Sequence, residues 1–458
     1  MSAGLLLLGA LSALATGGVL ELDEVLDSVD RFPASIAAVA ERRIAAGESL
    51  AARGAFDPTL RARGVFDVAG YYRNQVFDVS IEAPTPLWGT TLIAGYRAGF
   101  GDFPSYDGKL ATNAGGEVRA GVQVPLLRNG PIDRRRANID RARVGERFAE
   151  EGVRLQRLDL ERVAMARYWD WVGAGFRWRI ARDLLALAEA RQAQLVARVA
   201  AGDLPDIERL ENERALRQRE AQVVAARRGV EQAAIELAVF LRAADGSSLP
   251  PTEERLPPRL REPELPLPLP DGVLLDSLRL RPERRRLSLL AQQLEIERKL
   301  AKNQLLPSVD LFGVVSRDLG GGDKVRAQTE LELGVQIDLA ILFRAARGRL
   351  AVAEGQLART NAQLGLLERR IEAEIRDLHS ALRAGKERLA LVRREVELAA
   401  GLAKAELERF ELGDSTLLLV NLREQAAAEA GVREIDALVE LQRALGQFRL
   451  AQGASLRD

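Results

Sequence analysis

Residues 330–339 read ELELGVQIDL, ten positions in which apolar and polar side chains alternate without a break. Because successive side chains of a strand point to opposite faces, the leucines, valine and isoleucine share one face and the acids the other. Residues 117–126, EVRAGVQVPL, repeat the pattern. Strands of this length with one apolar and one charged face are typical of outer-membrane barrels around a wet lumen. A soluble antiparallel sheet with one solvated face gives the same alternation.

The pattern predicts four principal strands, because residues 57–72 and 307–316 also alternate. Nine of the 22 aromatic residues fall between positions 66 and 106, as expected for interfacial girdles and outer loops. Four strands cannot close a barrel, so a barrel must be shared between two, three or four copies. Residues 79–100 are left open as either a further hairpin or an extracellular loop.

The rest of the chain has helical periodicity. Helices are predicted over residues 21–52, 132–200, 206–242, 271–303, 345–412 and from 415 to about 451. The two helices of about 68 residues would each extend roughly 100 Å. In the second of them, spacings of three and four predict a coiled-coil seam of period near 3.5, with Gly385 in its one empty slot. The seam residues are Ile371, Ile375, Leu378, Leu382, Leu389, Val392, Val396 and Ala399.

The order of strands, long helix, glycine break and return helix occurs twice, which indicates an internal duplication. Residues 198–203, RVAAGD, and 409–414, RFELGD, occupy equivalent helix ends. We predict a signal peptide at 1–15, a first repeat at 16–245, a proline-rich linker at 246–271 and a second repeat at 272–458. The fold class is therefore mainly α, with long antiparallel coiled-coil hairpins and a membrane β-barrel.

Composition excludes several classes of function. Lys+Arg 66 equals Asp+Glu 66, so no net field favours nucleic acid, and the absence of cysteine removes disulfides and thiolate chemistry. The single histidine, His379, lies in a helical pattern, and Gly320–Gly322 precede a strand pattern rather than the helix N-terminus that a phosphate loop needs. No enzyme, cofactor or metal site is predicted.

The apolar run at residues 4–15 ends in the small-x-small pattern Ala13, Leu14, Ala15, which favours export, although no Lys or Arg precedes it. No other stretch approaches the ~18 to 20 apolar residues of a membrane helix.

Five short motifs in this order resemble those of the TolC-type outer-membrane efflux family. They are VQVPLLRNG at 122–130, AGDLPDIERLENERAL at 201–216, RPE at 281–283, LLPSVDL at 305–311 and LGDSTLLLVNLREQ at 412–425. The resemblance covers nearly the whole chain after residue 15. It implies a homotrimer with a twelve-stranded barrel in the outer membrane of a Gram-negative-type envelope and a helical tunnel through the periplasm. It also implies a channel that serves as the exit duct of a tripartite efflux or export system.

The resemblance further implies that the two helix-turn-helix tips form the tunnel mouth and contact a periplasmic adaptor protein and, with it, an inner-membrane pump. The corresponding residues here are Gly202, Asp203, Asp206, Glu208, Phe410, Gly413, Asp414, Ser415, Leu419 and Leu422. Where some family members carry two gating carboxylates, this chain has Leu419 and Leu422. A leucine constriction beside an acidic rim follows, and the same acids also suit helix capping.

Two other classes compete with the channel. A periplasmic adaptor also has a long coiled-coil hairpin, but usually one rather than two, together with an inner-membrane anchor. A cytosolic coiled-coil scaffold accounts for the seam but not for the charged strand faces. Which small molecules are conducted, whether drugs, metal ions or other solutes, is not specified by any motif.

Overall fold

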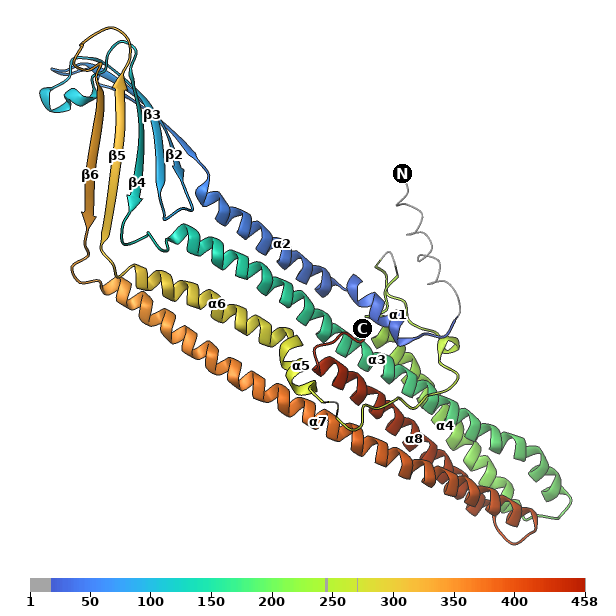
Figure 1. The fold of residues 1–458 in the computed structure, drawn as a ribbon. Coiled ribbons are helices and arrows are strands. Elements are labelled where there is room, and N and C mark those ends of the chain that lie inside the picture. Colours follow the sequence, from blue (N-terminus) through green and yellow to red (C-terminus); the bar gives the residue numbers. More distant parts are fainter. Residues whose placement is uncertain (1–17, 244–245, 270, 458) are drawn as a thin grey trace, which may run out of the picture. The chain divides into compact units, whose positions relative to one another are not determined.

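The computed structural model describes residues 18–243, 246–269 and 271–457, so the expected signal peptide lies outside the described residues (Figure 1). The main helices are α1 (Leu22–Ser28), α2 (Pro33–Arg53), α3 (Arg134–Ala200), α4 (Asp206–Ala238), α5 (Val273–Leu280), α6 (Pro282–Asn303), α7 (Arg344–Glu411) and α8 (Leu417–Ala451). Short 3-10 turns are η2 (Val29–Arg31), η3 (Gly54–Phe56), η4 (Ser105–Leu110) and η5 (Glu253–Arg255). The strands are β1 (Thr59–Phe66), β2 (Asn74–Pro84), β3 (Thr91–Gly101), β4 (Glu117–Pro125), β5 (Ser308–Asp318) and β6 (Thr329–Asp338).

The long helices end within a residue or two of the positions that the sequence predicts. Two predicted helices are divided in the structure, each immediately before a proline. Phe32 and Arg281 have extended ψ values of 138° and 119°, and Pro33 and Pro282 then begin α2 and α6. Proline disfavours helical backbone in the residue before it and fits the first turn of the next helix, which accounts for both breaks.

The sheet has six strands instead of the four expected. They pair in the order β1-β2-β3-β4-β5-β6, and every pair is antiparallel. Residues 79–100, for which the sequence left both a hairpin and an extracellular loop open, belong to a hairpin. Its strands β2 and β3 pair along their whole length, from Asn74 with Gly101 to Pro84 with Thr91. The period-2 signal of this hairpin is weaker than that of β4 or β6, because Gly95 and Gly99 stand on its polar face in place of polar side chains, and its apolar face includes small alanines.

The chain forms two compact units, each built from both predicted repeats. One unit comprises Ala40–Glu151 and Arg285–Leu366 and contains the sheet and the helix segments next to it. In this unit the Arg141 guanidinium lies 3.1 Å from the Glu297 carboxylate, and Arg286 stacks 4.3 Å from the centre of the Phe148 ring. The predicted proline-rich boundary at residues 246–271 separates the two repeats along the sequence, but it does not separate these two units.

The other unit comprises residues 1–39, 152–284 and 367–458, of which the described part holds most of the buried apolar core. Trp171 of α3 is fully buried in a cluster with residues of α1, α4 and the proline-rich segment. Leu260 of that segment contacts this cluster and also the one between α7 and α8. The proline-rich segment therefore packs along the helices by its leucines, as irregular chain rather than as a free linker.

The predicted seam of α7 packs against α8. Ile371, Ile375, Leu382 and Leu389 are all at most 1% exposed and form one cluster with α8 residues. At the empty slot, a Cβ on Gly385 would lie 3.0 Å from Leu441 Cδ1, so glycine makes room for the leucine of the opposite helix. Beyond Leu389 the seam positions are only half-buried.

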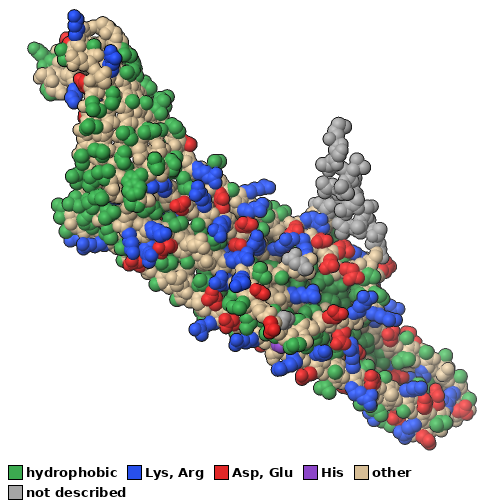
Figure 2. All heavy atoms as spheres, in the orientation of Figure 1, with side chains coloured by type: hydrophobic (Ala, Val, Ile, Leu, Met, Phe, Trp, Pro, Cys, Tyr) green, Lys and Arg blue, Asp and Glu red, His purple; other side chains and the backbone are tan. Residues whose placement is uncertain are grey.

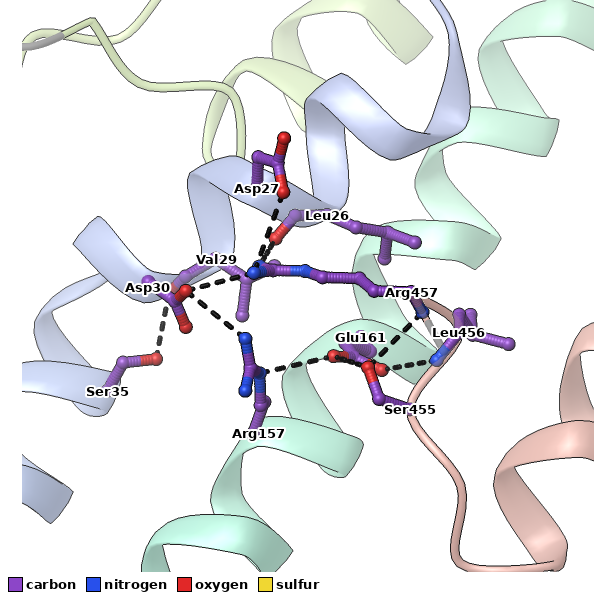
Figure 3. Close-up of polar contacts among 10 residues, drawn as sticks. All are labelled: Leu26, Asp27, Val29, Asp30, Ser35, Arg157, Glu161, Ser455, Leu456 and Arg457. Atoms are coloured by element: carbon purple, nitrogen blue, oxygen red, sulfur yellow. Dashed lines mark hydrogen bonds and ion pairs between the residues drawn. The ribbon is translucent and has the colours of Figure 1, made fainter. Parts of the chain in front are cut away.

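A polar cluster fastens the C-terminal tail to α1 and α3 (Figure 3). Glu161 of α3 is fully buried and accepts hydrogen bonds from Ser455 Oγ at 2.8 Å and from the Leu456 backbone N–H at 3.0 Å. Arg157 also lies beside it, with Nε 3.4 Å from the carboxylate. Arg457 then pairs with Asp30 at 2.9 Å. The tail is thus held by charge-assisted bonds, which are stronger than neutral ones.

Candidate functional site

The polar face of the sheet carries most of its charged side chains. The strand register places them in rows that cross the sheet: one row is Arg61, Ser80, Gly95, Arg119, Ser316 and Glu330, and the next is Arg63, Asp78, Arg97, Glu117 and Asp318. Arg119 lies 2.6 Å from Asp78, and Arg97 pairs with Glu117. At the β1–β2 end, Arg61 lies 2.9 Å from Glu82. These pairs hold a hydrated, mixed-charge surface in fixed positions.

The opposite face is apolar and open to the surroundings. Its rows include Leu60, Ile81, Ala94, Ala120, Val315 and Leu331, and Val122, Gly313 and Leu333. Val315 is 47% exposed, and Leu333 is 70% exposed. Figure 2 shows apolar side chains gathered over the strands, whereas Lys, Arg, Asp and Glu are frequent over the helices. A contiguous apolar surface across six strands is larger than soluble monomers usually leave in water.

The sheet is open at both edges, since β1 and β6 each have one strand partner among the described residues. On the polar face, edge strand β1 carries Arg61 and Arg63, and edge strand β6 carries Glu330, Glu332 and Asp338. Arg63 and Glu330 make no ion pair within residues 18–243, 246–269 and 271–457. The two edges therefore present opposite charges on the same face.

The predicted helix-turn-helix tips are two turns of the same construction. Gly202 and Gly413 have φ of 80° and 85°, the left-handed conformation that glycine adopts without strain. In each turn the N–H after the glycine donates to a helix carbonyl five residues back: Asp203 to Arg198 and Asp414 to Arg409, both at 2.9 Å. The duplicated sequence at 198–203 and 409–414 thus encodes one helix-ending motif twice.

The two turns are joined by their side chains. Glu208 of α4 accepts a hydrogen bond from the Leu417 backbone N–H at 3.0 Å, and so caps the N-terminus of α8. Leu195, Phe410, Leu417 and Val420 form a small buried cluster behind the turns. Phe410 is 5% exposed, so it supports the turn from within. Ser415 is half-buried and donates a hydrogen bond to the Glu406 carboxylate.

The remaining predicted tip residues divide between paired acids and exposed leucines. Leu419 is 42% exposed and Leu422 is 56% exposed, and other exposed leucines and isoleucines of the two turns are Leu412, Leu418, Ile207 and Leu210. Arg209 binds Asp206 at 2.7 Å, and this hydrogen bond holds the pKa of the Asp206 carboxyl below its usual range. Glu208 serves as a cap, as the capping interpretation of these acids expects.

Sequence reasoning missed a buried charge network next to the turns. Glu424 of α8 is 6% exposed and binds both Arg219 of α4, at 2.9 Å, and Arg191 of α3. Asn421, one turn earlier, accepts a hydrogen bond from Arg219 at 3.3 Å. The only signal in the sequence is that Asn421 stands among apolar residues of the 412–425 motif, with Glu424 three positions later, and their partners lie about 200 positions away.

The described residues contain no group of three or more His, Asp or Glu placed to hold a metal ion. His379 packs near Phe448, with ring centres 6.4 Å apart. Of the helices described, none is both long enough and apolar enough to cross a bilayer.

Comparison with solved structures identifies this architecture. The outer-membrane channel OprN superposes with a TM-score of 0.66 at 18% identity, covering 95% of this chain and 90% of OprN. The Neisseria gonorrhoeae outer-membrane channel MtrE gives 0.67 at 17% identity, covering 94% and 88% of the two chains. This chain has the fold of outer-membrane channels.

The likeness to the outer-membrane channel CmeC of Campylobacter jejuni is similar, with a TM-score of 0.65 at 13% identity over 94% of this chain and 85% of CmeC. No protein-family model and no curated protein sequence matches the chain. The likeness to these channels is therefore one of fold, and it extends over the helices and the sheet together.

Proposed function

We propose that this chain is an outer-membrane channel that serves as the exit duct of an efflux or export system. The observation that carries the proposal is the sheet: one of its faces is apolar and exposed, and the opposite face carries rows of paired charges. A bilayer accepts the first face, and a water-filled lumen accepts the second. The shared fold with outer-membrane channels and the resemblance to TolC-type motifs support the same function.

An open sheet edge in hydrocarbon would leave backbone N–H and C=O groups unpaired, at several kcal/mol each. We propose that copies of the chain close the barrel edge to edge. Because each copy has six strands in sequential antiparallel order, β6 of one copy runs antiparallel to β1 of the next. Three copies, as the family resemblance implies, give three times six, or eighteen strands, in place of the twelve expected from four strands per chain.

The charges on the edge strands support this closure. Arg61 and Arg63 on β1 would lie on the same face as Glu330 and Glu332 on the neighbouring β6. Opposite charges across an antiparallel pair contribute roughly 0.2 to 1 kcal/mol each, and like charges oppose pairing. Head-to-tail assembly is therefore favoured over pairing of two identical edges.

The turns at Gly202 and Gly413 are proposed to form the periplasmic mouth. Exposed Leu419 and Leu422 would contact the channel axis or a periplasmic adaptor, which connects the duct to an inner-membrane pump. The proposed cargo is small exported solutes, such as drugs or metal ions.

Three measurements test the proposal. Envelope fractionation should recover the chain with the outer membrane, and unboiled gel samples should run as an oligomer that heating converts to the 50.1 kDa chain. The purified oligomer should add stepwise ion conductance to a planar bilayer. A monomer that stays in the soluble periplasmic fraction and conducts no ions would refute the channel.

A further inference from the structure

The connection between β3 and β4, residues 102–116, folds back onto the polar face of the sheet. Gly99 stands on that face, two residues from Arg97. Thr112 donates its backbone N–H to the Gly99 carbonyl at 3.1 Å, and a Cβ on Gly99 would lie only 1.8 Å from the Leu110 carbonyl oxygen. The loop thus rests directly on the strand, and glycine is required because the two backbones touch.

Burial on β2 traces the same contact. Asn74 and Val76 occupy polar-face positions and are only 8% and 9% exposed, although that face is otherwise open. Asn74 donates a hydrogen bond to the Asp102 carbonyl at 3.4 Å. The loop therefore covers the polar face at β2 and β3, rather than extending away from the strand ends.

The loop is anchored at its far end by Asn113, which is 3% exposed. Its side chain donates to the Asp323 carbonyl at 3.0 Å and accepts from the Asp323 N–H at 2.9 Å, and its own N–H donates to the Asp318 carboxylate at 2.9 Å. These partners lie on β5 and on the β5–β6 connection. A buried amide with each of these bonds made holds a loop in one position.

Between its contacts with Gly99 and with Asp323, the loop extends along the strands toward the middle of the polar face. Lys109 lies 3.9 Å from Glu332, whose register row also contains Ile93. Ile93 is six residues from Gly99 along β3, or about 20 Å at 3.3 to 3.4 Å per residue. A hollow of about 960 Å³ separates loop and sheet, and among its lining residues are Lys109, Arg119, Glu330 and Glu332.

We propose that residues 102–116 form a constriction inside the channel, at which Lys109 and the acids facing it select among small ions and solutes. The proposal rests on the proposed function, because the polar face is the lumen only when copies close the sheet. Glu82, Arg97 and Arg119, which also line the hollow, are already in ion pairs with strand residues. The three remaining acids, Asp318, Glu330 and Glu332, face two bases, Lys109 and Arg326, so the constriction favours cations weakly.

The first test moves the loop without cutting it. Gly99→Val inserts a side chain where the Leu110 carbonyl lies, at a strand position that valine otherwise suits. Single-channel conductance and the size of the largest neutral polymer that enters should both rise. Gln123→Val is the control, since it places the same residue on the polar face of β4, outside the residues that line the hollow, and should leave both values at those of the parent.

The second test needs no displacement. The chain has no cysteine, so Lys109→Cys creates its only thiol. A bulky charged thiol reagent should then lower the current through open channels. Tyr71, in the β1–β2 connection, is 92% exposed, so Tyr71→Cys should be labelled without loss of current. Lys109→Gln, without reagent, should increase the preference for cations.

The outcomes separate the two proposals. A parent protein that forms no channels refutes the proposed function and this inference together. Channels whose current is unchanged by quantitative labelling at position 109, as judged by mass, refute the constriction alone. An equal loss of current at positions 71 and 109 also refutes it, because the reagent would then act at the mouth. If Gly99→Val does not assemble, the labelling experiment still decides.

Discussion

Adjacent valines of β5 provide a sharp test of which sheet face meets lipid. Val315 lies on the apolar face and is 47% exposed, whereas Val314 lies on the polar face directly opposite Glu332. Val315 is two residues from Gly313, the centre of an eleven-residue strand, or about 7 Å along it. In the proposed channel, an arginine at position 315 therefore enters the hydrocarbon near its midplane, where it costs about 2 to 4 kcal/mol per chain.

The same arginine at position 314 points toward the lumen of the proposed channel. It meets Glu332 across the strand pair, and such a pair contributes roughly 0.2 to 1 kcal/mol. Residue type, replacement and strand are identical in the two variants, so differences in expression or β propensity cancel. We expect Val314→Arg to assemble like the parent and Val315→Arg to accumulate as monomer.

The assay is the fraction of envelope protein that migrates as the heat-sensitive oligomer, measured against urea concentration and normalised to total chain by immunoblot. Val315→Arg should lose the oligomer at lower urea, or fail to form it. Equal urea midpoints for both variants, or greater damage from Val314→Arg, would show that the apolar rows do not face lipid.

Three further predictions concern the helices. Glu424→Gln leaves two buried arginines without their carboxylate, so thermal unfolding followed by circular dichroism should show a loss of about 3 to 5 kcal/mol, and no loss would mean that the network is solvated. Burial raises the pKa of the Tyr168 hydroxyl, which donates to the Leu20 carbonyl at 3.1 Å, so the stability that this group contributes is full below pH 10 and declines as pH rises above 10. Tyr168→Phe should therefore lower the free energy of unfolding by about 0.5 to 1.5 kcal/mol at pH 8, and its stability should fall less than that of the parent between pH 10 and 11. An equal loss of stability in both proteins over that pH range would contradict this. Replacing both Leu419 and Leu422 with Ser should raise single-channel conductance if these exposed leucines narrow the mouth, and unchanged conductance would place the constriction elsewhere.

Helix boundaries were predictable from sequence because their signals are local. A left-handed glycine ends α3 and α7, and the period of the α7 seam is carried by large aliphatic residues. The breaks before Pro33 and Pro282 were missed because amphipathic periodicity continues on both sides of each proline. The prediction followed this periodicity, although proline disfavours helical backbone in the residue before it.

The candidate site was predictable in part. Alternation identified the two faces of β4 and β6, because each strand's own residues encode them. It could not reveal the ion pairs across strands, such as Arg119 with Asp78, since register is set by pairing between segments. The buried position of Phe410 was missed for a similar reason: its partners Leu195 and Val420 come from separate helices.

The β2–β3 hairpin makes the bore of such a duct adjustable in discrete increments. A chain that enters and leaves the sheet from the same side must carry an even number of strands, so growth can occur only by whole hairpins. Barrel diameter rises roughly in proportion to strand number, and in a three-copy assembly each added hairpin contributes six strands. The hairpin begins and ends between β1 and β4, so its insertion leaves the helices and their turns in sequence untouched. The width of the barrel is thus set by residues separate from those of the helix-turn-helix tips.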